Sequence, residues 1–190
     1  MTRRVLHRRA WLACAAVVLA APAAAAQTAP PPLPPEVSTE LHGARWRGTG
    51  VMRFFGLHIY DARLWSAAAT SAITADGAAQ PLALELVYAR SLVGEQIASR
   101  SITEMKRVGS FTDAQSALWL QAMTALFPDV KAGDRLTGVQ KPGQGTRFYM
   151  NGTLRGEVAD ADFTRLFFGI WLSPKTSEPK LRAQLLGGAP

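Results

Sequence analysis

The chain of 190 residues has almost no cysteine, since its single example, Cys14, lies within the first 26 residues. The rest of the sequence therefore offers no disulfide bond, no thiol nucleophile and no cysteine-ligated metal site. Histidine is nearly as scarce: only His42 and His58 follow that segment, and no acidic cluster accompanies them. We expect both histidines to have ordinary packing or surface roles, and we expect neither a metal nor another cofactor.

The sequence also lacks the motifs that mark common catalytic and nucleotide-binding chemistries. It contains no G-x-S-x-G, no G-x-G-x-x-G and no H-E-x-x-H. Residues 43–49 are glycine-rich, but they lack the lysine that a phosphate-binding loop requires. After the first ten residues no block of like charge points to a nucleic-acid partner, and no apolar run reaches the roughly 20 residues that span a bilayer.

The first 26 residues have the three-part organisation of a secretory signal peptide. Residues 1–10 carry four arginines, residues 11–21 are apolar, and residues 24–26 are alanines that suit signal peptidase. Cleavage after Ala26 would leave 17 basic and 14 acidic residues, so the formal net charge would fall from +7 to +3. We expect a periplasmic or secreted protein that uses the general secretory route. Arg8-Arg9 keeps the twin-arginine route open as the alternative.

A proline-rich segment follows the predicted signal peptide. Five prolines lie within residues 30–35. Proline at this density cannot continue a helix or a central strand, so we expect residues 27–39 to form an extended linker. Residues 40–190 have the length of one ordinary domain and show no internal repeat.

The first half of this domain alternates between strand and helix signals. Residues 44–65 are rich in aromatic and β-branched residues with interspersed glycines, which is typical of two or three strands with tight turns. Residues 82–88 predict another strand. The apolar residues of 93–108 recur on one helical face, and Thr112 with Gln115 forms a capping box for a second helix.

The second half predicts strands over residues 134–140 and 146–158, with a hairpin turn at Asn151-Gly152. Asp160 then caps an amphipathic helix, and a last short helix begins at about Pro179. These elements predict an α+β fold, with an antiparallel sheet and helices on one of its faces.

Several motifs, taken in order, resemble those of bacterial chalcone isomerase-like proteins. They are GVMRFFGLHIYDARLW at 50–65, LFPDVKAGD at 126–134, PGQGT at 142–146, Asn151-Gly152, and DFTRLFFGIWL at 162–172. The resemblance covers about residues 40–187. It implies an open-faced β-sandwich, in which a large antiparallel sheet packs helices against one face.

The resemblance implies one of two activities, because members of this family divide between catalysis and binding. Plant enzymes cyclise chalcones with an arginine, a threonine, a tyrosine and an asparagine, whereas related plant proteins bind fatty acids. The resemblance places Arg47 or Arg53 at the arginine position, Tyr60 near the threonine, and Val93 and Arg100 near the tyrosine and asparagine. Since most of the polar groups that activate a chalcone are replaced, we expect no flavanone synthesis.

We therefore expect a non-catalytic binder of a fatty acid or another amphipathic small molecule. Arg53, Arg47 and Tyr60 are the candidate ligand-binding residues, because an arginine can hold a carboxylate through paired charge-assisted hydrogen bonds. One alternative is an isomerase for an unidentified conjugated substrate, with Arg53 as electrophile and Tyr60 as proton donor. Another is a structural or partner-binding protein.

Two groups of side chains in the predicted helices are expected to have structural roles only. The apolar stripe of the helix after Asp160 is expected to be core, and the charged side of the helix at 93–108 is expected to be solvated. The residues concerned are Phe163, Phe167 and Trp171 for the stripe, and Arg100, Glu104 and Arg107 for the charged side.

Overall fold

The computed structural model describes residues 29–67, 73 and 80–187, so the predicted signal peptide lies outside the described residues. Helices and strands alternate in blocks along this part of the chain. The elements are α1 (Pro35–Glu40), β1 (Arg45–Phe54), β2 (Leu57–Ser66), β3 (Leu82–Tyr88), α2 (Gly94–Val108), α3 (Asp113–Leu126), β4 (Arg135–Lys141), β5 (Gly145–Met150), β6 (Thr153–Val158), α4 (Ala161–Leu172) and α5 (Pro179–Leu185).

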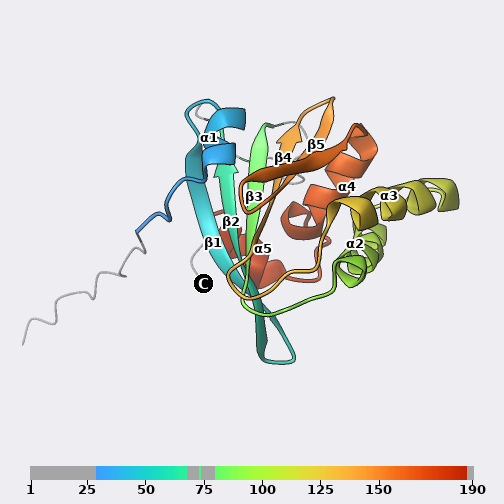
Figure 1. The fold of residues 1–190 in the computed structure, drawn as a ribbon, viewed down its shortest axis with the longest axis horizontal. Coiled ribbons are helices and arrows are strands. Elements are labelled where there is room, and N and C mark those ends of the chain that lie inside the picture. The colour runs from blue at the N-terminus through green and yellow to red at the C-terminus, as the bar shows by residue number, and fades with distance from the viewer. Residues whose placement is uncertain (1–28, 68–72, 74–79, 188–190) are drawn as a thin grey trace, which may run out of the picture.

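The six strands form one antiparallel sheet whose spatial order is the chain order, β1 to β6 (Figure 1). Helices α2 and α3 lie in the connection between the adjacent strands β3 and β4. Side chains alternate between the two faces of the sheet. In β3, Leu82, Leu84 and Leu86 belong to the core on the helix side, and Ala83 belongs to a smaller cluster on the other side.

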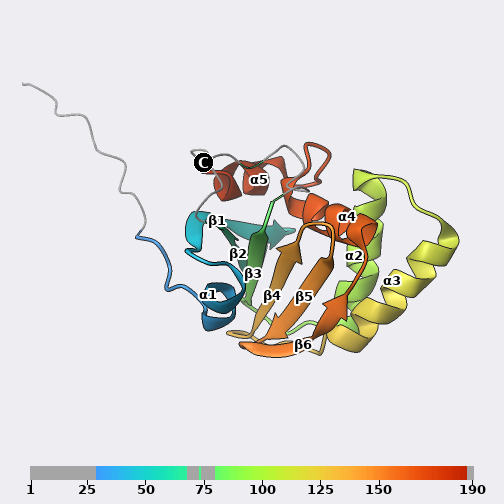
Figure 2. The same cartoon turned by 90° about the horizontal axis from the view of Figure 1, so that it is seen from above.

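Helices α2, α4 and α5 cover one face of the sheet, and α3 packs outside α2 (Figure 2). An aromatic cluster fills the space between α4 and the sheet, with the rings of Phe148 and Phe167 edge to face at 5.2 Å. Helix α5 lies close over β1 because Gly48 has no side chain: a Cβ there would lie 2.1 Å from the carbonyl oxygen of Gln184. This arrangement confirms the predicted α+β sheet with helices packed on one face. No helix of the described residues is long and apolar enough to cross a membrane.

The local predictions are confirmed at several element ends. The Gln115 N–H donates to Thr112 Oγ1 at 3.1 Å, which forms the capping box of α3. The Phe163 N–H donates to Asp160 Oδ1 at 2.9 Å at the start of α4. Asn151 and Gly152 have φ angles of 51° and 86° in the turn between β5 and β6.

The linker prediction differs from the structure at its C-terminal end, because residues 35–39 belong to helix α1. Proline is tolerated in the first turn of a helix, where its missing N–H has no partner to lose. Val37 is fully buried against the sheet face opposite the other helices. The Glu40 carboxylate forms an ion pair with Lys141, with Oε2 and Nζ 2.7 Å apart. Apolar burial and charge pairing therefore fold a segment whose proline content alone indicates a tether.

Candidate functional site

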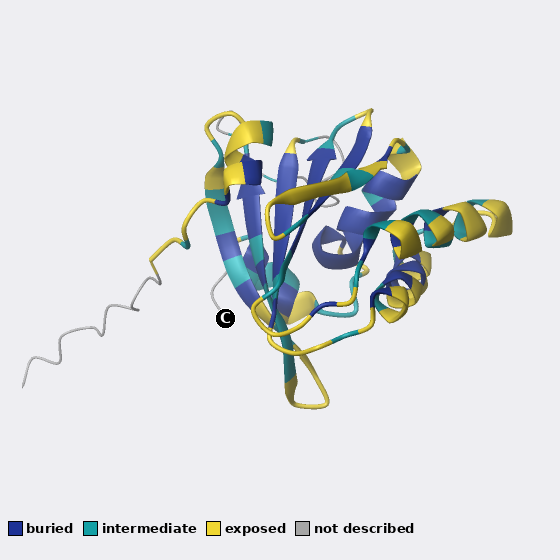
Figure 3. Cartoon of the chain, viewed as in Figure 1, coloured by how far each residue is buried: buried dark blue, intermediate teal, exposed yellow. Residues whose placement is uncertain are grey.

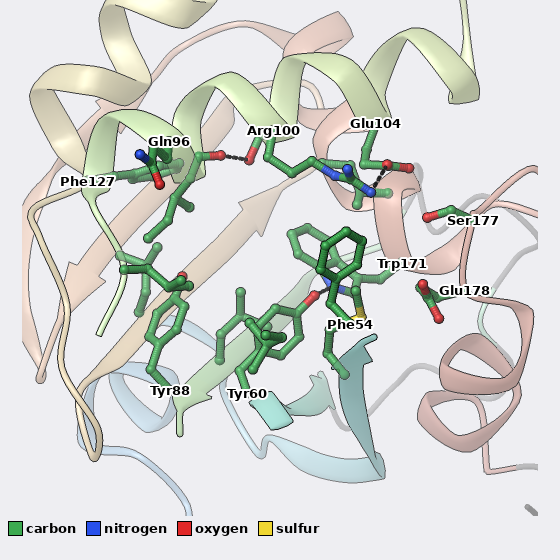
Figure 4. A pocket seen from close by; sticks show the side chains of 18 of the residues that line it. Phe54, Tyr60, Tyr88, Gln96, Arg100, Glu104, Phe127, Trp171, Ser177 and Glu178 are labelled. Carbon is green, nitrogen blue, oxygen red and sulfur yellow. Dashed lines mark hydrogen bonds and ion pairs between the residues drawn. The ribbon is translucent and has the colours of Figure 1, made fainter. Parts of the chain in front are cut away.

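A cavity of about 350 Å³ lies between the inner face of the sheet and the helices. Strands β1 to β4 form its floor and α2 its roof, while α4 and the segment before α5 close one side (Figure 4). Its volume is in the range of about 300–1,000 Å³ that is typical of small-molecule sites. The lining residues are Met52, Phe54, Ile59, Tyr60, Leu86, Tyr88, Leu92, Gln96, Ile97, Arg100, Ser101, Glu104, Phe127, Leu136, Phe167, Ile170, Trp171, Ser177 and Glu178.

Strand geometry determines which residues of β1 and β2 face this cavity. Met52 and Phe54 line it, two positions apart on the same side of β1. In β2 the pairing register shifts, which leaves Ile59 as an extra residue between two paired neighbours. Such a bulge re-aims side chains, and here Ile59 and Tyr60 both line the cavity.

Two tyrosines stand on the cavity floor. The Tyr60 hydroxyl accepts a hydrogen bond from Trp171 Nε1 at 3.0 Å, and burial raises the pKa of Tyr60 to about 12. Tyr88 packs edge-on against Tyr60, with ring centres 6.0 Å apart, and burial raises its pKa as well. Both phenols are therefore neutral near pH 7. The Tyr88 hydroxyl makes no hydrogen bond to another described residue, so it is available to a polar group of a ligand.

Helix α2 places an arginine at the opening of the cavity. Arg100 is half-exposed, its Nη2 lies 2.7 Å from Glu104 Oε1, and its guanidinium carbon lies 5.8 Å from the ring centre of Phe54. Arg107 forms an ion pair with the same carboxylate, with its Nε 3.3 Å from Glu104 Oε2, but Arg107 does not line the cavity. Arg100 is the only lysine or arginine among the described lining residues.

Two carboxylates of the described residues, Glu104 and Glu178, also line the cavity. The charge of Glu104 is matched by Arg100 and Arg107. Glu178 is half-buried beside Ser177 and forms no ion pair within the part of the chain that the structure describes (Figure 4). No group of three or more histidine, cysteine, aspartate or glutamate side chains in the described residues is arranged to hold a metal ion.

The structure places the three sequence-predicted site residues in different environments. Tyr60 lines the cavity. Arg53 is exposed, and its backbone lies opposite His58 in the pairing of β1 with β2. It lies between Met52 and Phe54 along β1, so its side chain is on the other side of the strand and does not line the cavity. Arg47 lies toward the other end of β1, at a second register shift, and its Nε donates to Ser66 Oγ.

The prediction that the charged side of helix α2 is solvated is wrong for Glu104, whereas the Arg100 and Arg107 side chains are more than half exposed. Glu104 is buried, and both Arg100 and Glu104 line the cavity. Their positions carried a signal: Arg100 and Glu104 follow Ile97 by three and seven residues, and residues so spaced share one helical side. The core prediction for α4 is also incomplete, because Phe167 and Trp171 are buried and line the cavity as well.

Comparison with known proteins identifies the relatives of this fold. A family model described as chalcone isomerase-like matches residues 27–187. The chain belongs to the chalcone isomerase-like family. An uncharacterized protein of Haemophilus influenzae is 32% identical over 146 residues, which cover 76% of this chain and 69% of the relative.

This chalcone isomerase-like chain also resembles a crystal structure of an Arabidopsis thaliana fatty-acid binding protein. The TM-score is 0.61 at 13% sequence identity, over 77% of this chain and 88% of the plant chain. The similarity confirms the fold that the motifs implied. At this identity it establishes shared architecture alone, so the ligand has to be argued from the cavity.

Proposed function

We propose that this chalcone isomerase-like domain binds a fatty acid, or a similar amphipathic molecule, with its acyl chain in the cavity under α2. One observation carries the proposal: the interior is apolar, with Leu86, Leu136 and Ile170 among its walls, and Arg100 stands at the opening. An acyl chain gains about 0.8 kcal/mol for each methylene that leaves water. The fatty-acid binding described for the structurally similar Arabidopsis protein supports this ligand class.

Arg100 is the proposed anchor of the carboxylate head group. A guanidinium holds a carboxylate through two parallel charge-assisted hydrogen bonds. In the structure Arg100 is paired with Glu104, which has a second cation in Arg107. Glu104 therefore keeps a partner when Arg100 turns to a ligand, so the exchange leaves no buried charge alone.

The isomerase alternative has less support from this geometry. It assigns Arg53 and Tyr60 to one substrate, but Arg53 does not line the cavity with Tyr60. With a pKa of about 12, Tyr60 is also poorly matched to proton transfer near pH 7.

Titration calorimetry with saturated fatty acids of increasing length tests the proposal. We expect one acid per chain, and an affinity that rises by up to about fourfold with each added methylene until the cavity is full. An affinity that does not depend on chain length would contradict the proposal, because the acyl chain would then lie outside the cavity.

We also propose that the protein acts outside the cytoplasm, on the basis of the basic, apolar and alanine-rich order of residues 1–26. Protein recovered from the periplasm is expected to begin at Gln27 or within a few residues of it, because the three alanines before Gln27 suit signal peptidase. Intact-mass measurement checks this, and a periplasmic form that still carries Met1 would contradict cleavage.

Glu178→Gln is expected to strengthen fatty-acid binding by up to about fivefold. Glu178 lines the cavity without an ion pair to a described residue, so it repels a carboxylate bound in the same cavity. Exposed charge pairs are worth roughly 0.2–1 kcal/mol, which sets the size of the gain. Calorimetry with a fatty acid and its methyl ester measures it, and the ester should be unaffected.

Glu95→Gln is the matched control for this change, because Glu95 is exposed in the first turn of α2 and does not line the cavity. It should leave the affinity unchanged. Weaker binding by Glu178→Gln would instead show that Glu178 accepts a hydrogen bond from the ligand, and that the head group is not a carboxylate.

A further inference from the structure

The turn between β1 and β2 exposes large apolar side chains that the fold does not use. Phe55 is 91% exposed, Leu57 54% and Phe54 46%. We refer to residues 54–57 as the hairpin tip. Figure 3 shows this tip as an exposed projection beyond the body of the domain. Neighbouring apolar residues at such exposure on one turn mark a contact surface rather than a packing element.

The backbone of the hairpin tip makes the phenylalanine more unusual. Phe55 has a φ of 47° and Gly56 a φ of 78°. Two-residue turns of this kind favour asparagine, aspartate or glycine, because bulky side chains rarely adopt positive φ. Since Phe55 gains almost no burial in exchange, its presence there is not explained by the stability of the domain.

The hairpin tip is continuous with the opening of the cavity. Phe54 is both half-exposed and a lining residue, so it stands on the rim. The guanidinium of Arg100, which belongs to α2, lies over the ring of Phe54, which belongs to β1 (Figure 4). A surface that contacts the tip therefore also faces the entrance to the cavity.

The charged residues around the hairpin tip favour an anionic surface. Arg53, directly before the tip, is exposed. The Ala89 N–H donates to the Ile59 carbonyl at 2.9 Å, which brings the exposed Arg90 beside the returning strand. Neither arginine forms an ion pair with another described residue. The one carboxylate on these strands close to the tip, Asp61, is bound to His58 at 2.9 Å.

We infer that the hairpin tip inserts into a phospholipid bilayer that contains anionic lipid, and that this contact brings the cavity opening to the membrane surface. Aromatic and aliphatic side chains enter the boundary of the acyl region, while flanking arginines bind lipid phosphates. If the cavity holds a fatty acid, as proposed above, the fatty acid then passes between the bilayer and the cavity without crossing water.

Vesicle partition tests this inference with two double variants of protein recovered from expressing cells. Phe55→Gln/Leu57→Gln removes the apolar tip, and neither residue lines the cavity. Leu118→Gln/Leu154→Gln removes two other leucines, 64% and 53% exposed, on α3 and β6. The vesicles are made of phosphatidylethanolamine with phosphatidylglycerol, and phosphatidylcholine alone serves as the uncharged surface.

The unmutated protein is expected to bind the anionic vesicles more strongly than the uncharged ones. The tip variant should bind at least tenfold more weakly, because burying one large apolar side chain contributes roughly tenfold or more, and the control variant should stay within twofold. Unchanged binding by the tip variant would overturn the inference, as would an equal loss of binding in the tip and control variants.

A separate titration with dissolved fatty acid, without vesicles, keeps the two proposals distinguishable. The tip variant should bind the acid as the unmutated protein does. A protein that binds vesicles through its hairpin tip but binds no fatty acid would refute the proposed function alone. A protein that binds the fatty acid but does not bind vesicles would refute the membrane contact alone.

Discussion

Ser101→Phe is expected to weaken the binding of a long-chain fatty acid by about a hundredfold. Ser101 is buried on the cavity side of α2, and within the described part of the chain its hydroxyl bonds only to the Ile97 carbonyl one turn earlier, at 2.9 Å. A phenyl ring at this position can extend only into the cavity, and no tertiary hydrogen bond is lost. The ring would displace roughly three or four methylenes, each worth about 0.8 kcal/mol.

Ser99→Phe provides the matched control for this substitution. Ser99 lies on the same helix, is exposed and does not line the cavity. Calorimetry should therefore find its affinity unchanged. Thermal unfolding of Ser101→Phe should occur at the same or a higher temperature, because filling an internal void commonly stabilises a domain. Full fatty-acid affinity in a folded Ser101→Phe protein would place the acyl chain elsewhere.

Arg100→Gln is expected to weaken fatty-acid binding about tenfold and to leave methyl-ester binding unchanged. A hydrogen bond to a charged group contributes about 1.5–3 kcal/mol. Arg100 is 56% exposed, so water screens its charge and the effect should fall at the lower end of this range. The unmutated protein should prefer the acid to the ester, and the variant should bind both equally. Parallel titrations of acid and ester measure the difference.

Arg107→Gln separates the anchor from the local ion pairs. Arg107 is 55% exposed and binds the same carboxylate of Glu104, but it does not line the cavity. Both variants therefore remove one partner of Glu104, and only Arg100→Gln removes a group at the opening. Equal losses of acid affinity in the two variants would show that Glu104, rather than Arg100, determines the effect.

The fold was largely predictable because local chemistry and tertiary packing agree over most of the domain. The capping box at Thr112 and the turn at Asn151-Gly152 each require particular residue types, and both occur as expected. Helix α1 was not predictable from its prolines. Its stability comes from Val37 on the outer sheet face and from the ion pairs of Glu40, which join positions about 100 residues apart.

The site was harder to predict than the fold, because the side of a strand on which a residue lies depends on register. Tyr60 lines the cavity, but Arg53 lies one position from two lining residues, Met52 and Phe54, and does not line it. A single bulge at Ile59 alters the alternation in β2. The arginine at the opening, Arg100, comes from α2. The charge pattern of α2 is equally typical of a helix with a solvated side, so it does not by itself indicate a binding residue.

Native mass spectrometry of the protein, purified without detergent from the cells that express it, tests the central claim most directly. The account predicts a population that carries one added mass equal to that of a fatty acid or a similar amphipathic molecule. This population should be present in Ser99→Phe and lost in Ser101→Phe. A chain that carries no such mass, and that also takes up none when fatty acid is added, would contradict the claim that the cavity under α2 binds an acyl chain.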